Sequence, residues 1–168
     1  MKWFPLALLA APACAGAAPD PWVLTVDGLG PVRIGMTIAE VEKAIGGKLE
    51  GDAIESDDIC VEKDSKAGPP GIGYMFEDKK LVRISIGEGS TILTPRGIGY
   101  GASAADVRRA YGAKLESEPH AYAGPPAEYL TYWTIKGKRG WNFETDEKRR
   151  VQVIFAGTQA IQYIEGCA

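Results

Sequence analysis

The strongest constraint on the fold is an internal similarity within this chain of 168 residues. Residues 31–50 align without a gap with residues 97–116, and glycine, alanine and valine recur at matching places. Both stretches end in Lys-Leu-Glu, and a second shared string, Phe-Glu, follows each of them further along the chain. Internal repetition of this kind decides the architecture of a protein. We therefore expect two tandem units, over residues 18–88 and 89–168.

Each of the two stretches is predicted to hold one short helix. Thr37 and Glu40 have the spacing of a capping box, in which the hydroxyl and the carboxylate satisfy backbone N–H groups at the helix start. Ser103 and Asp106 form a weaker copy of the same pattern. After each cap, apolar side chains recur at helical spacing. Glycine at position 46 and at position 112 is expected to end each helix in a left-handed conformation.

After each helix the hydrophobic pattern changes from helical to alternating. The predicted strands of the first unit are 58–62, 72–77 and 81–86, and those of the second are 128–135, 140–145, 151–155 and 161–164. Polar residues at 78–80 and 145–148 are expected to form hairpin turns. The predicted fold class is therefore α+β, with two tandem repeats that each pack a short helix on a small antiparallel sheet.

The first 17 residues have the layout of a secretory signal peptide. Lys2 precedes a short apolar run, and Ala15 and Ala17 form an Ala-x-Ala cleavage motif. The run is shorter than the ~20 residues that a membrane-spanning helix needs, so we do not expect a transmembrane protein. The expected location is periplasmic or secreted, and the alternative is a lipoprotein anchored through Cys14.

Export changes the expected chemistry of the remaining cysteines. Cys60 and Cys167 are an even pair in an oxidising compartment, so we predict a disulfide bond between them. A bond that closes so long a loop contributes roughly 4–5 kcal/mol in chain-entropy models, and it would hold the C-terminus in place. A metal site is not expected, because the chain has no Cys-x-x-Cys motif and only one histidine.

Composition and motifs argue against several classes of function. The net charge of −3 does not fit a nucleic-acid-binding protein. The only histidine, His120, is expected to be a surface-loop residue without a catalytic role. The acidic run 50–58 lacks the regular ligand spacing of a calcium loop, and the Gly-x-Gly pairs do not open a helix in a nucleotide-binding unit. We therefore expect no cofactor, no metal and no enzymatic activity.

Aromatic residues gather on two predicted neighbouring strands. Tyr129, Thr131 and Trp133 share one face of the strand 128–135, because side chains alternate along a strand. Trp141 and Arg139 lie on the next strand or at its edge. Together these five residues predict a partner-binding surface, since aromatic and arginine side chains are enriched at interfaces. The alternative is that the rings fill a small core and the charges line turns.

The segment from Arg33 to Thr37, with Val41 and Gly46, resembles the G-M-T/S-x-x-x-V-x-x-x-x-G signature of small exported bacterial modules. This signature occurs in the BamE (SmpA/OmlA) outer-membrane assembly lipoproteins and in the secreted beta-lactamase inhibitory proteins. The two-copy layout is more similar to the inhibitory proteins, which contain two tandem copies of a helix and a sheet. The second half also resembles exported bacterial proteins that have no assigned activity.

The resemblance and the residues together suggest a function. We expect an exported, non-enzymatic binding protein of the bacterial envelope that presents a sheet face to a protein partner, as an inhibitor or an assembly factor. The alternative is a hydrolase or carbohydrate-processing enzyme that uses Glu144 and Asp146, two carboxylates near the aromatic surface.

Overall fold

The computed structural model describes residues 22–51 and 59–167. The predicted signal peptide and Cys14 lie outside these residues, as does most of the acidic run 50–58. None of the helices in the described part of the chain is long and apolar enough to cross a membrane.

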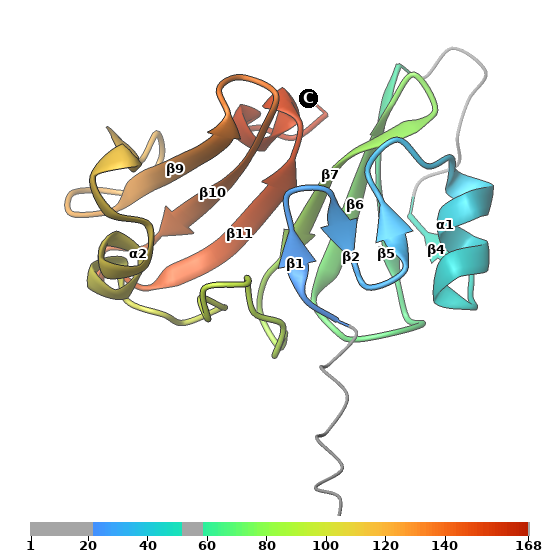
Figure 1. The fold of residues 1–168 in the computed structure, drawn as a ribbon, viewed down its shortest axis with the longest axis horizontal. Coiled ribbons are helices and arrows are strands. Elements are labelled where there is room, and N and C mark those ends of the chain that lie inside the picture. Colours follow the sequence, from blue (N-terminus) through green and yellow to red (C-terminus); the bar gives the residue numbers. More distant parts are fainter. Residues whose placement is uncertain (1–21, 52–58, 168) are drawn as a thin grey trace, which may run out of the picture.

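The centre of the protein is one antiparallel sheet of eight strands (Figure 1). The strand order is β4-β5-β6-β7-β11-β10-β9-β8, so the strands of the two halves meet where β7 pairs with β11. The first four strands are β4 (Leu49–Glu50), β5 (Cys60–Ser65), β6 (Ile72–Glu77) and β7 (Lys80–Ile86). The others are β8 (Glu116–Pro119), β9 (Glu128–Ile135), β10 (Arg139–Thr145) and β11 (Val151–Gly157).

The predicted fold class is wrong. The described part of the chain is mostly β, with two short α-helices, and the strands of both halves form one eight-stranded sheet, so it does not consist of two repeats of a helix on its own small sheet. Pairing of β7 with β11 explains the difference, because it joins the strands that would otherwise be edges of separate sheets. An unpaired edge leaves backbone N–H and C=O groups exposed, and the joined sheet removes two such edges from the middle of the molecule.

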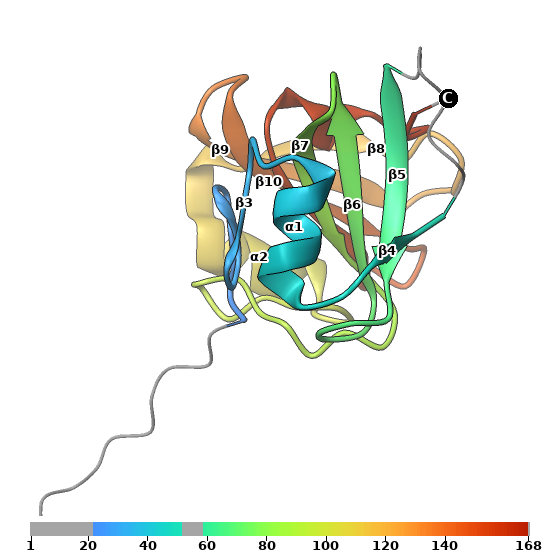
Figure 2. The same ribbon diagram turned by 90° about the vertical axis from the view of Figure 1, so that its right-hand side faces the viewer.

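The two helices begin as the capping patterns predict. α1 (Ile38–Ile45) starts with a complete capping box between Thr37 and Glu40, and α2 (Ala104–Tyr111) starts with one between Ser103 and Asp106. The residue after α1 is left-handed glycine, as expected. Two backbone hydrogen bonds tie each helix start to the sheet. The N–H groups of residues 35 and 101 donate to the carbonyl oxygens of residues 81 and 151, and the N–H groups of residues 81 and 151 donate to the carbonyl oxygens of residues 36 and 102. Figure 2 shows α1 in front of the large sheet, between β3 and β6 in that view.

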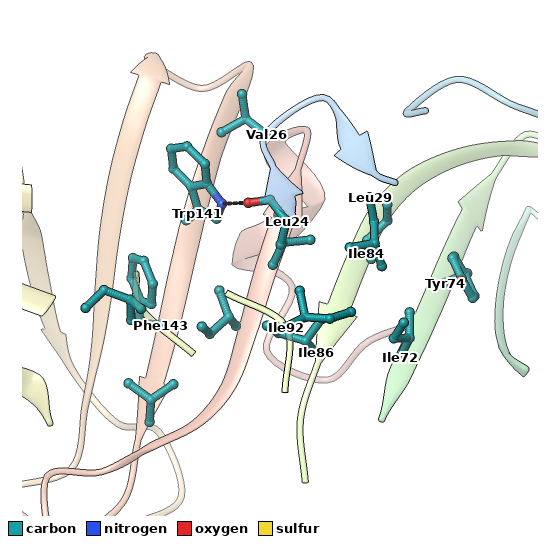
Figure 3. Packing of buried hydrophobic residues seen from close by; sticks show 14 of the residues in the cluster. Leu24, Val26, Leu29, Ile72, Tyr74, Ile84, Ile86, Ile92, Trp141 and Phe143 are labelled. Atoms are coloured by element: carbon teal, nitrogen blue, oxygen red, sulfur yellow. Dashed lines mark hydrogen bonds between the residues drawn. The ribbon is translucent and has the colours of Figure 1, made fainter. Parts of the chain in front are cut away.

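The helices and a second, three-stranded sheet cover the same face of the large sheet, which we call the core face. The small sheet consists of β1 (Leu24–Thr25), β2 (Gly28–Leu29) and β3 (Val32–Arg33). Its apolar side chains join those of both helices and of the central strands in one hydrophobic cluster. The indole of Trp141 donates a hydrogen bond to the carbonyl oxygen of Leu24 at 3.2 Å, which fixes β1 over β10 (Figure 3).

The end of the chain lies on the opposite side of the large sheet, which we call the outer face. The strand predicted at 161–164 is wrong, because residues 159–162 form a short 3-10 helix, η2 (Gln159–Gln162). Thr158 caps η2 by accepting a hydrogen bond from the N–H of Ala160. The predicted disulfide between Cys60 and Cys167 is confirmed, with a Cα–Cα distance of 5.4 Å. The C-terminal segment, residues 158–167, therefore reaches from the end of β11 to β5.

Candidate functional site

The five residues predicted to bind a partner do not form one exposed surface. Trp141 is opposite Tyr132 in the register, so it points to the core face and is buried there. Tyr129 and Thr131 point to the outer face, but both are also buried. The structure therefore places three of the five side chains out of reach of a partner, on two different sides of the sheet.

Trp133 and Arg139 are half-buried. Arg139 forms an ion pair with Asp27 at 3.3 Å, which links the end of β10 to the turn between β1 and β2. Trp133 lies on the outer face near Gly140, where a Cβ atom would stand 2.9 Å from the indole and 3.1 Å from Ile161 of η2. The aromatic residues of the outer face are thus covered by the chain itself.

His120 holds the loop between β8 and β9 against the outer face. Its side chain is only 10% exposed, and its Nε2 atom lies 3.0 Å from a carboxylate oxygen of Glu144. Its Nδ1 atom accepts hydrogen bonds from the N–H groups of Tyr122 and Ala123, both at 3.0 Å. The ring also stacks on Tyr129, with 4.6 Å between the ring centroids. The expectation of an ordinary surface-loop histidine missed these contacts, because the partners are distant in sequence.

The contacts of His120 argue against a catalytic role. Because Nδ1 accepts two backbone hydrogen bonds, Nε2 carries the ring proton and donates it to Glu144. A general base needs a ring nitrogen that can reach a proton of the substrate. Both nitrogens already have partners inside the protein, so this histidine positions a loop.

The two carboxylates considered for hydrolysis have separate structural contacts. Glu144 bonds to His120, whereas Asp146 accepts hydrogen bonds from the N–H groups of Lys148 and Arg150 and from the side chain of Gln152. Paired glycosidase carboxylates instead face one scissile bond from its two sides. Among the residues that the structure describes, no group of three or more His, Cys, Asp or Glu side chains is arranged to hold a metal ion.

Comparisons of the chain with protein-family models, with curated proteins and with solved structures find no match. The resemblance to the BamE lipoproteins and to the beta-lactamase inhibitory proteins therefore stays an expectation from a short motif.

One candidate is a cavity of about 540 Å³ beside the disulfide, which we call the disulfide cavity. Two exposed apolar side chains line it, Tyr122 at 68% and Ile164 at 53% exposure. The hydroxyl of Tyr122 donates a hydrogen bond to Glu165, and this contact raises the pKa of Tyr122. The other lining residues are Cys60, Glu77, Gln162, Tyr163, Glu165, Gly166 and Cys167. The sequence pattern gave no signal for this cavity, because its walls come from four separate segments of the chain.

The walls of the disulfide cavity are firmly held. The disulfide fixes the last described residue, and Arg83 donates hydrogen bonds to the carbonyl oxygens of Ala160 and Tyr163 at 3.0 and 2.9 Å. His120 fixes the backbone of Tyr122 from the opposite wall. Exposed apolar side chains on a rigid frame lose little conformational entropy when a partner binds.

Proposed function

We propose that this chain is an exported, non-enzymatic binding protein of the bacterial envelope, periplasmic or secreted, and that it contacts a protein partner through the disulfide cavity. The observation that carries the proposal is the pair of exposed side chains, Tyr122 and Ile164, beside a cavity of about 540 Å³. Large apolar side chains at the rim of a concave surface are typical of protein interfaces, and tyrosine is among the residues enriched there.

The disulfide between Cys60 and Cys167 supports the exported location, since such bonds persist in oxidising compartments. The internal contacts of His120, Glu144 and Asp146 support a non-enzymatic role, because they occupy the groups that the hydrolase alternative would use. A sheet face is no longer part of the proposal. The C-terminal segment covers the outer face of the sheet, and the partner surface proposed here belongs to that segment and to the loop after β8.

The test is affinity capture from an envelope extract with three forms of the oxidised protein. The double variant Tyr122→Ser/Ile164→Ser should lose the captured partner, because it removes both apolar contacts. Ile135→Ser is the matched control, since Ile135 is 57% exposed at the β9–β10 hairpin and does not line the cavity. Thermal unfolding of all three forms shows whether each is folded. Equal capture by the double variant and the control, or no specific capture by the wild type, would refute the proposal.

A further inference from the structure

A second cavity shares no lining residue with the disulfide cavity. Its volume is about 700 Å³, within the range of small-molecule sites, and we call it the basic cavity. The start of α2, the loop between β8 and β9, and the turn between β10 and β11 form its walls. Its lining residues are Ser103, Ala104, Ala105, Arg108, Ser117, Pro119, Pro125, Pro126, Ala127, Glu128, Lys148, Arg149 and Arg150.

Positive charge is concentrated in this cavity, although the whole chain carries a net charge of −3. Four cationic residues line it, and Glu128 is the one acidic residue among the lining set. Glu128 pairs with Arg108. Within residues 22–51 and 59–167, no carboxylate forms an ion pair with Lys148, Arg149 or Arg150. Three exposed cations therefore face the cavity without a neutralising partner.

In the described part of the chain, the carboxylates next to these cations in sequence accept backbone N–H groups and form no ion pair with the cationic side chains. Asp146 accepts backbone N–H groups of its own turn, and Glu147 accepts the N–H of Gly124 at 3.2 Å. Neither residue lines the cavity. The net charge of the lining, four cations and one carboxylate, matches a doubly charged anion better than a single carboxylate.

The remaining walls suit the organic part of a ligand. Ser103 and Ser117 add hydroxyl groups, and proline and alanine residues supply a rigid apolar side. Arginine guanidinium groups bind phosphate oxygens with two parallel hydrogen bonds, and lysine adds a point charge. We propose that the basic cavity binds a phosphate group carried by a small organic molecule or by a lipid headgroup.

Arg149 offers a way to separate binding from folding. Its φ is 59°, in the left-handed region that favours glycine, and its backbone carbonyl accepts a hydrogen bond from the N–H of Ala104 at 2.9 Å. Glycine is compatible with the backbone conformation of this turn, so the substitution removes the side chain with its guanidinium and keeps the backbone carbonyl. Lys79 is the matched control, because it is a cation with a φ of 64° in the β6–β7 turn and does not line the basic cavity.

We titrate ¹⁵N-labelled protein with glycerol phosphate and, separately, measure its co-sedimentation with vesicles that contain phosphatidic acid, because both probes carry a phosphate monoester that can hold two negative charges. Sodium chloride at equal ionic strength is the control for charge screening. We expect saturable shifts of the amides that line the basic cavity, and Arg149→Gly should weaken binding about tenfold, the loss expected for one charge-assisted hydrogen bond. Lys79→Gly should leave the affinity unchanged. Thermal unfolding of both variants shows that the fold is kept.

The titration and the co-sedimentation assay together distinguish the two sources of the phosphate group. Saturable binding of glycerol phosphate assigns the site to a free ligand, and binding to vesicles alone assigns it to a lipid headgroup. Either result supports the proposal if Arg149→Gly weakens it and Lys79→Gly does not. The proposal is overturned if neither probe binds, if sodium chloride produces the same shifts, or if Arg149→Gly and Lys79→Gly have the same affinity for the probe.

Discussion

Replacement of Arg83 by methionine tests whether side-chain hydrogen bonds hold the C-terminal segment on the outer face of the sheet. Arg83 is buried on β7, and its guanidinium stacks on the ring of Phe155 with 4.5 Å to the ring centroid. One guanidinium nitrogen donates to the carbonyl oxygens of Ala160 and Tyr163. The second terminal nitrogen of the guanidinium lies 2.6 Å from a carboxylate oxygen of Glu62, with which it forms an ion pair. Methionine replaces the aliphatic part of the side chain with an unbranched apolar one and lacks the guanidinium, so the change removes mainly the polar contacts.

The size of the effect follows from these contacts. Burial lowers the pKa of Arg83 from its ordinary value, while Glu62 opposes this shift, and the guanidinium is charged at neutral pH. The ion pair contributes less than about 1 kcal/mol, because the carboxylate of Glu62 is half exposed and solvent screens it. Two hydrogen bonds from a charged donor to carbonyl oxygens contribute about 3 kcal/mol together, less the cost of burying the charge. We expect Arg83→Met to lower the free energy of unfolding by about 2–3 kcal/mol.

Urea-induced unfolding of the oxidised protein measures this loss, and hydrogen exchange shows where it acts. The N–H of Tyr163, which donates to the carbonyl oxygen of Ala160, should lose its protection in the variant. Glu62→Gln is the control, because it removes only the charge of the half-exposed partner and should cost less than about 1 kcal/mol. If Arg83→Met unfolds at the urea concentration of the wild type and the Tyr163 amide stays protected, the disulfide alone holds the segment.

Three further predictions concern other parts of the fold. The double variant Cys60→Ala/Cys167→Ala should lose about 5 kcal/mol in urea unfolding, because the bond links residues 107 apart in sequence, and a loss below about 1 kcal/mol would contradict this. Gly140→Ala should lower the melting temperature, since its Cβ would stand 2.6 Å from the carbonyl oxygen of Tyr132; an unchanged value in a thermal scan would show that the strands can move apart. Asp106→Asn should destabilise the protein at neutral pH, because hydrogen bonds from Ser103 lower the pKa of Asp106 below its ordinary value of 3.8 and stabilise its charged form. That difference should shrink as the pH falls below about 3.8 through the folded-state pKa, and a difference independent of pH in urea unfolding would refute the assignment.

Local features of this fold could be predicted from the sequence because short-range rules determine them. The capping boxes at Thr37 and Ser103 depend on residues three positions apart, and both form as expected. The strands expected at 72–77 and 128–135 have these bounds in the structure. The hairpins could be predicted from the polar residues at 78–80 and 145–148, because the two strands of a hairpin are adjacent in sequence.

Features that depend on distant contacts could not be predicted in the same way. The pairing of β7 with β11 joins residues about seventy positions apart, and no local pattern specifies it. Ile161 and Ile164 suggested a strand, but the cap at Thr158 and the contact of Ile161 with Gly140 favour a turn of 3-10 helix. The partners of His120 are a strand residue and its own loop, so its burial became visible only in three dimensions.

Burial of both faces of β9 and β10 explains why the aromatic pattern pointed to the wrong surface. In a sheet with one exposed face, a strand alternates between core and solvent, and polar residues mark the open side. Here Thr131 and Asn142 are polar and buried on the outer face, while Trp141 and Phe143 are buried on the core face. Polar residues on such a strand therefore do not indicate an open surface. The C-terminal segment lies on this side, held by the disulfide and by the hydrogen bonds of Arg83, so the surface that we propose for a partner belongs to this segment and not to the strands.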